Sequence, residues 1–241
     1  MKNILFLWTL LCLLQPATAQ EPASQPAIAL KWAPTGLFVG SISLQGEYNF
    51  GNRSLTAKIG LPANTRRSFT YQEKDAAFSM KATSFLAGYR LYLSKKQLKG
   101  FYLEPYFKYV HHTAEGAGTG TLTGESVVMD FTNDYNGFGV GAQLGAQFLI
   151  GKRFLIDLFF FGPEINSSTN NFKAVETSNA LAWNSVQASE AENNIRDFIN
   201  QFPFVKNRTD VRVDKANRTV MANFKGALPG FRTGVSFGFL F

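Results

Sequence analysis

The sequence is poor in cysteine, in charge and in long apolar runs, and each shortage excludes a class of protein. Its single cysteine, Cys12, lies close to the N-terminus, so the residues beyond it form no disulfide and no thiolate metal site. The longest apolar run, Ile4–Leu14, is shorter than the roughly 20 residues of a spanning helix, which excludes a multi-pass helical membrane protein. Charged residues make up only 17% of the chain and aromatic residues 15%, which argues against a disordered chain.

Residues 1–19 are typical of a secretory signal peptide, with a positive start at Lys2, an apolar centre and a small-x-small cleavage site at Ala17-Thr18-Ala19. Lipoprotein processing at Cys12 is the alternative, but the residue before it, a leucine, is bulky where that signal requires a small side chain. We therefore expect cleavage after residue 19, a flexible leader over 20–26 and one domain over 27–241. Loss of one lysine from the 24 basic residues leaves a net charge of about +6 against the 17 acidic residues.

Eight segments alternate apolar and polar side chains with the period of two that is typical of β-strands. In the last segment Phe237, Phe239 and Phe241 share one face, while Ser236 and Gly238 share the other. The segments cover 27–33, 41–50, 54–61, 84–93, 101–112, 137–150, 154–161 and 231–241.

The connections between these segments alternate between short and long. Short turns are expected at 51–53, 94–100 and 151–153, and long connections at 62–78, 113–134 and 166–225. This alternation predicts an all-β fold: an eight-stranded antiparallel up-and-down transmembrane β-barrel with short periplasmic turns and a long external loop over 166–225. A soluble sandwich that buries the apolar faces is the alternative. Aromatic residues near the strand ends and a polar face rich in Gly, Ser and Gln favour the barrel.

The C-terminal residues Phe237, Phe239 and Phe241 resemble the sorting signal that the barrel assembly machinery reads on outer-membrane proteins. The chain as a whole resembles small eight-stranded barrels of the OmpA/OmpX type. The segments Ala29-Leu30-Lys31-Trp32 and Gly40-Ser41-Ile42-Ser43-Leu44, followed by Glu47-Tyr48, are similar to the opening of a family of exported Gram-negative barrels with no assigned function. This resemblance implies a fold and a location in the cell outer membrane, and it implies no activity.

The parity of each strand places eight charged side chains inside the barrel. They are Lys31, Glu47, Lys58, Arg90, Glu104, Lys108, Asp157 and Arg232. An eight-stranded barrel is just wide enough for side chains to fill, so we expect a hydrogen-bonded ion-pair plug with a structural role. A small pore lined by the excess positive charge is the alternative.

Catalytic candidates are few. His111 and His112 are the only histidines, and a hydrolase acting on lipid A or peptides could combine one of them with Ser126 and Glu115. Adjacent strand residues face opposite sides, however, and no nucleophile motif accompanies them. The glycines of 137–145 superficially match a dinucleotide fingerprint, but no helix follows, and small lumen residues that leave room for Arg90 or Tyr102 explain them better. We expect no enzyme activity, cofactor or metal.

The long connection 166–225 carries the remaining signals. A helix is expected in its middle, with Ser189 and Glu192 as a capping box, a stop at Pro203 and a hairpin over 210–221. One face of this helix carries Ala188, Ala191, Ile195, Phe198, Ile199 and Phe202. We expect it to pack over the barrel rim or mouth, or to dock a protein partner.

The expected partners follow from charge and compartment. Basic residues of the expected external loops could contact phosphates of lipopolysaccharide, and they are Arg66, Arg67, Lys206, Arg208, Arg212, Lys215 and Arg218. No nucleic-acid recognition motif accompanies the positive charge. The sequence predicts a structural or surface-interaction protein in contact with outer-membrane lipid.

Overall fold

The structure is a computed structural model that describes residues 25–71, 74–94 and 96–241. The expected signal peptide and most of the expected leader lie outside the described residues. The strands and helices occupy the following ranges: β1 (Ala27–Ala33), η1 (Pro34–Val39), β2 (Ser41–Phe50), β3 (Arg53–Pro62), β4 (Thr65–Tyr71), β5 (Lys74–Tyr92), β6 (Gly100–Leu122), β7 (Glu125–Ile150), β8 (Phe154–Glu176), α2 (Ser185–Asn200), η2 (Lys206–Arg208), β9 (Thr209–Asp214) and β10 (Thr219–Leu240).

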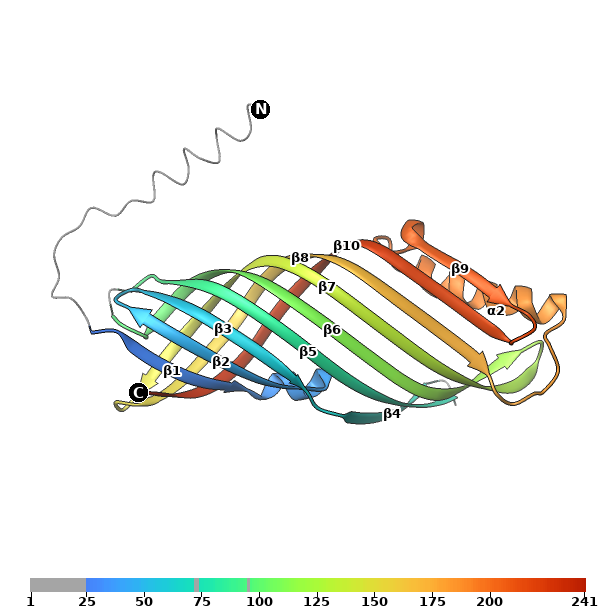
Figure 1. Ribbon diagram of the computed structural model, residues 1–241, viewed down its shortest axis with the longest axis horizontal. Coiled ribbons are helices and arrows are strands. Elements are labelled where there is room, and N and C mark those ends of the chain that lie inside the picture. Colours follow the sequence, from blue (N-terminus) through green and yellow to red (C-terminus); the bar gives the residue numbers. More distant parts are fainter. Residues whose placement is uncertain (1–24, 72–73, 95) are drawn as a thin grey trace, which may run out of the picture.

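Eight antiparallel strands close into a ring in the order β1, β2, β3, β5, β6, β7, β8 and β10. The ring closes where β1 pairs with β10, from Ala29 opposite Leu240 to Trp32 opposite Phe237. The predicted all-β, eight-stranded up-and-down barrel is therefore confirmed. Figure 1 shows β1 and the C-terminus together at one end, with α2 and β9 at the other.

The apolar side chains of the ring point outward and the polar ones inward. Phe239 is 57% exposed on the outer face of β10, whereas Ser236 on the inner face of the same strand is fully buried. Phe237 and Phe241, the other residues of the expected sorting signal, are exposed as well. A sandwich with phenylalanines buried between two sheets is thus wrong for this chain.

The outer face changes from apolar to polar part-way along the long strands. The last large apolar or aromatic positions are Tyr109, Phe138 and Ile165 on β6, β7 and β8, and Tyr109 pairs directly with Phe138. Beyond them most outward positions carry polar or small side chains, with Val128 an apolar exception, and they include the exposed residues Glu115, Thr132, Asn171 and Lys225. The apolar outer face is therefore a band of limited height.

Five strands continue beyond this band as an open sheet, which we call the extension. The expected loop over 113–134 is wrong, because β6 and β7 run through it and meet in a turn at Thr123-Gly124. The expected loop over 62–78 is wrong as well, since β4 and the start of β5 form a hairpin there. Over most of 113–122 both faces carry small or polar residues, so the alternation that reveals a strand fades from the sequence there.

The long loop expected over 166–225 is shorter in the structure, because β8 continues to Glu176 and β10 begins at Thr219. The remaining connection contains the predicted helix, α2, and β9 forms the predicted hairpin with β10. The predicted capping box at Ser189 and Glu192 is wrong. The side chain of Asn184 caps the helix by accepting hydrogen bonds from the Val186 and Gln187 amides, and the Gln187 side chain accepts one from the Asn184 amide.

Helix α2 covers the inner face of the extension, beyond the ring. Ala188, Ala191 and Ile199 of the helix are buried, whereas Phe198 and Phe202, which were expected on the same face, are exposed and stack edge-to-face on each other. The helix packs on apolar side chains of four strands. They are Leu122, Val127, Val211, Val220 and Ala222.

A bulge in β8 reverses the parity of that strand. Phe159 pairs with Gly145 and Phe161 with Leu144, so Phe160 is an extra residue without an opposite on β7. Before the bulge the odd-numbered side chains of β8 face inward, and after it the even-numbered ones do. No helix in the described part of the chain is long and apolar enough to cross a bilayer.

Replacing Asn184 by Ala removes the helix cap, and we expect α2 to lose about 1 kcal/mol of local stability. Faster amide exchange in α2 than in the wild type would measure this loss. Ser189→Ala, at the cap position that the sequence suggested, is the matched control and should leave the exchange unchanged. Equal effects of the two substitutions would contradict the assignment.

Candidate functional site

Five of the eight predicted lumen charges form one network in the end of the barrel that holds the C-terminus. Lys31 Nζ lies 2.5 Å from Glu47 Oε2 and 2.7 Å from Asp157 Oδ2. Arg90 reaches three carboxylates: its Nη2 lies 2.7 Å from Glu104 Oε2, and its Nη1 lies 2.9 Å from Asp157 Oδ2 and 3.5 Å from Glu47 Oε2. Arg90, Glu104 and Asp157 have no exposed surface, so these ion pairs form away from solvent.

Neutral side chains satisfy most of the remaining oxygens of the network. Tyr92 and Tyr102 donate hydrogen bonds of 2.6 Å to Glu47 and Asp157, and the Arg90 guanidinium stacks 3.7 Å from the Tyr102 ring centroid. Gln147 accepts from Arg90 at 2.7 Å, and Thr56 donates to Glu104 at 2.5 Å. A buried charge network is tolerated only when its members are paired and hydrogen-bonded in this way.

Glycines on β7 and β5 leave room for these side chains. A Cβ atom at Gly145 would overlap the Tyr102 ring, and one at Gly88 would lie 2.5 Å from the Glu104 carboxylate. The predicted role of the glycine run of 137–145 is therefore confirmed for Tyr102, although Arg90 is not among its contacts.

The turn before β6 closes this end of the lumen. Leu98 is 1% exposed and packs with Tyr92 and Tyr102, and its carbonyl accepts a hydrogen bond from Gln147. The network and this apolar layer together fill the barrel interior.

Lys108 has a partner that the sequence reading missed. Its Nζ lies 2.5 Å from Glu164 Oε1, and Glu164 also accepts hydrogen bonds from Tyr106 and Asn166. Uninterrupted alternation from Asp157 would turn residue 164 outward. Only the bulge at Phe160 brings Glu164 into the lumen, and nothing in the local sequence signals its position.

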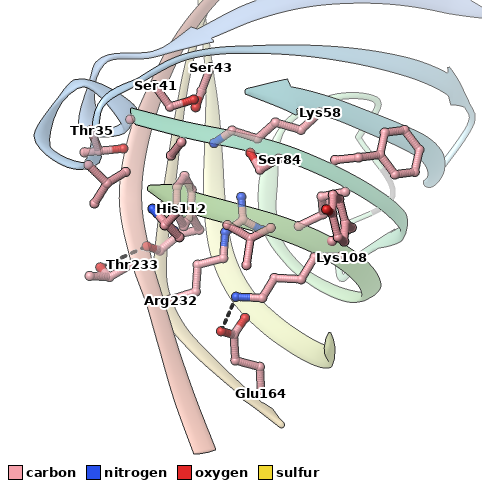
Figure 2. Close-up of a pocket in the computed structure, with 18 of the residues that line it drawn as sticks. Thr35, Ser41, Ser43, Lys58, Ser84, Lys108, His112, Glu164, Arg232 and Thr233 are labelled. Carbon is pink, nitrogen blue, oxygen red and sulfur yellow. Dashed lines mark hydrogen bonds and ion pairs between the residues drawn. The ribbon is translucent and has the colours of Figure 1, made fainter. Parts of the chain in front are cut away.

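A cavity of about 430 Å³ lies in the lumen between the network and the extension. Figure 2 shows Lys58, Lys108 and Arg232 converging on it from three strands, with Glu164 joined to Lys108. Ser41, Ser43, Ser84 and His112 also line it. The three remaining predicted lumen charges, Lys58, Lys108 and Arg232, thus belong to this cavity and lie apart from the sealed network.

The structure does not assemble the catalytic arrangement considered from the sequence. His111 faces outward and contacts Asn136 at 2.8 Å, whereas His112 lines the lumen cavity. Ser126 pairs with Thr121, ten residues further along β6 than His111, a separation of about 33 Å at the usual strand rise. Among the residues that the structure describes, no three histidine or acidic side chains are placed to hold a metal ion.

Three of the seven basic residues of the expected external loops have partners in the extension. Arg212 pairs with Asp210 at 2.6 Å, Arg218 donates to main-chain carbonyls, and Lys215 donates to Ser185. Arg66 and Arg67 lie in β4, and Lys206 and Arg208 form the ends of η2. They are spread over the extension and do not converge on one point.

A buried carboxylate fastens the segment that leads into α2. Glu176, 1% exposed, accepts hydrogen bonds from the Trp183 indole at 2.5 Å, from Asn179 at 2.7 Å and from Ser178 at 2.8 Å. Burial alone would raise the pKa of Glu176, but these three donors lower its pKa below the ordinary value of 4.5.

Comparison with protein-family models, with curated proteins and with solved structures finds no match to this chain.

Replacing Arg90 by Met leaves three buried carboxylates with one cation, and we expect a loss of about 3–5 kcal/mol in the free energy of unfolding. Urea unfolding of the detergent-folded barrel, followed by tryptophan fluorescence, measures the loss. Arg212→Met is the matched control, because it breaks an exposed ion pair worth less than about 1 kcal/mol. A similar small effect for both substitutions would contradict the role assigned to Arg90.

Because the pKa of Glu176 is lowered in the folded protein, the carboxylate stabilises the Trp183 contact above its unfolded pKa, and this stability is lost as the pH falls through the folded value. We expect the emission of Trp183, in a Trp32→Phe background, to shift to the red as the pH falls below about 4.5. Glu176→Gln is the control and should remove this pH dependence. Constant wild-type emission down to about pH 3 would refute the prediction.

Proposed function

We propose that this chain is an outer-membrane β-barrel with a structural or surface-interaction role, whose lumen is closed to ions. The observation that carries the proposal is the band of exposed apolar side chains around a closed ring whose interior holds the eight predicted charges. A soluble protein gains nothing from such a band, whereas a transmembrane barrel requires one about 25 Å high.

Details at the edges of the band support the same proposal. Tyr48, Phe50 and Tyr89 form a cluster of rings 6.1–6.5 Å apart at one edge, and Tyr109 and Phe138 stack at the other, 4.8 Å apart. Aromatic girdles at both interfaces are typical of outer-membrane barrels. The exposed C-terminal phenylalanines fit the proposed recognition by the barrel assembly machinery, and the resemblance to OmpA/OmpX-type barrels remains part of the proposal.

The extension would then project from the cell surface as the interaction surface. It is rigid because strands of 19–26 residues continue into it and α2 covers its inner face. Exposed Phe198, Phe202 and Phe204 lie at the end of α2 toward the band, with Phe204 beside Ile165 and Pro229. We propose that these rings lie at the lipid surface near lipopolysaccharide.

Cysteine labelling in intact cells tests this orientation. Cys12 is the only cysteine of the chain, and it lies in the expected signal peptide. After cleavage, an introduced cysteine would be the only thiol to label. We expect Glu125→Cys, at the tip of the β6–β7 turn, to react with a membrane-impermeant maleimide added outside. Lys152→Cys, in the turn at the opposite end, should react only after the outer membrane is permeabilised. Equal labelling of both, or recovery of the protein in a soluble periplasmic fraction, would overturn the proposal.

A conductance measurement distinguishes the alternative of a small pore from this proposal. The sealed network predicts no channel events in planar bilayers, even at high protein load, and steady conductance would favour the pore. The alternative of a hydrolase has no assembled nucleophile and base among the described residues to support it.

A further inference from the structure

Two cations that line the lumen cavity lie against the same aromatic ring. Lys58 Nζ lies 5.3 Å from the centroid of the Phe159 ring, and the Arg232 guanidinium carbon lies 4.8 Å from the same centroid. Since both distances are measured to one point, the two charged groups lie within about 10 Å of each other. Two like charges held this close in a cavity repel each other unless an anion joins them.

The ammonium group of Lys58 has unfilled hydrogen-bonding capacity. Lys58 is 9% exposed, yet among the described residues its only direct interaction is with the face of Phe159. None of the N–H donors of its ammonium group has a hydrogen-bond acceptor among the described residues. Within the same part of the chain, Arg232 donates a hydrogen bond only to the neutral Gln143, at 2.9 Å.

Hydroxyl groups surround the same space. Ser41 is 2% exposed, and its Oγ has no hydrogen-bond partner, although buried hydroxyls are normally paired. Ser43 and Ser84 flank Gly60 on the neighbouring strands, one on each side. A Cβ atom at Gly60 would lie 2.5 Å from Ser41 Oγ and would also overlap Ser84 Oγ, so the glycine keeps this wall open.

The one carboxylate that lines the cavity is already committed. Glu164 is held by Lys108, Tyr106 and Asn166, and its charge is balanced by Lys108. Within the described part of the chain, no acidic side chain remains to balance Lys58 and Arg232 at the cavity.

We propose that this cavity is a binding site for a phosphate group, held by Lys58 and Arg232 with hydroxyl donors from Ser41, Ser43 and Ser84. A guanidinium donates two parallel hydrogen bonds to a phosphate, an ammonium adds a point charge, and phosphate offers enough acceptor oxygens for the hydroxyls as well. The volume of about 430 Å³ lies within the range of small-molecule sites and leaves room for a group attached to the phosphate.

The phosphate can belong to a free solute or to a lipid headgroup. The structure of the barrel wall next to the site is relevant to this choice. Pairing of β1 with β10 ends at Trp32 and Phe237. Beyond that point η1 takes the place of a strand, and Thr35 lies beside Gly234. Thr35, Phe231 and Thr233 line the cavity, so its wall here is a helical turn against one strand. An alkyl chain can leave the cavity more easily through this seam than through a hydrogen-bonded pair of strands.

Calorimetric titration of the detergent-folded full barrel, in phosphate-free buffer, tests the proposal with two probes. One probe is inorganic phosphate, and the other is dodecyl phosphate in micelles of a neutral detergent. Saturable binding of both supports a soluble ligand, and binding of dodecyl phosphate alone supports a lipid headgroup. Binding of neither probe would overturn the proposal. This outcome does not depend on where the barrel resides in the cell, so it is separate from a failure of the proposed function.

Two variants connect the binding to the named residues. Lys58→Gln and Arg232→Gln should each weaken binding about tenfold or more, because each removes a charge-assisted hydrogen bond. Lys225→Gln is the matched control, since Lys225 is exposed on the outer face of the strand that carries Arg232. The affinity of this variant for the probes should stay at the wild-type value. Equal affinity in all three variants would overturn the site.

Thermal unfolding without phosphate separates binding from a purely structural role. Among the described residues Lys58 has no hydrogen-bond or ion-pair partner and contacts only the face of Phe159, so Lys58→Gln should unfold close to the wild-type temperature, whereas Arg90→Met should unfold well below it. A loss in Lys58→Gln as large as that in Arg90→Met would assign Lys58 to the structural network and overturn its role in binding.

Discussion

The structure depends on how the closed ring of eight strands fills its interior. Side chains alternate between the two faces of each strand, so an apolar outer face forces the polar set into a space only as wide as the side chains themselves. Burying charges there is costly unless each is paired. Lys31 and Arg90 meet this requirement by sharing three carboxylates, and two tyrosines and two glutamines occupy most of the remaining acceptor and donor positions.

The polarity of the two faces reverses along the strands. In the ring the outer face is apolar and the inner face is charged, whereas in the extension the outer face is polar and the inner face carries Leu122, Val127 and Val220 beneath α2. The change occurs near Tyr109, Phe138 and Ile165 on the outside. One continuous sheet therefore satisfies two environments. The change of surroundings from lipid to water that we propose at that level would account for both halves.

The ring could be predicted from the sequence because apolar and polar residues alternate strictly wherever one face of a strand is apolar and the other is polar. The prediction from alternation failed in the extension, where small and polar residues such as those of 113–122 occur on both faces and the period of two is lost. It also failed at Glu164, because the extra residue Phe160 reverses the parity of β8 and no local motif marks that bulge. The helix was found from its apolar spacing. Its cap was missed because Asn184 and Gln187 provide the capping box in place of a serine and a glutamate.

The two levels of the lumen differ in how completely their charged side chains are paired. The lower level is complete: its charges are paired, its glycines fit the aromatic rings opposite, and Leu98 closes it below. A solute that enters from the extension therefore meets a closed end, and passage through the barrel would require breaking several buried ion pairs at once. The upper level differs in its charges, because among the described residues Lys58 has no hydrogen-bond or ion-pair partner there. A cation without a counterion beside a layer of paired charges is suited to binding, because the paired layer fixes the geometry while the unpaired donor keeps its capacity for a ligand. The arrangement thus favours recognition over transport.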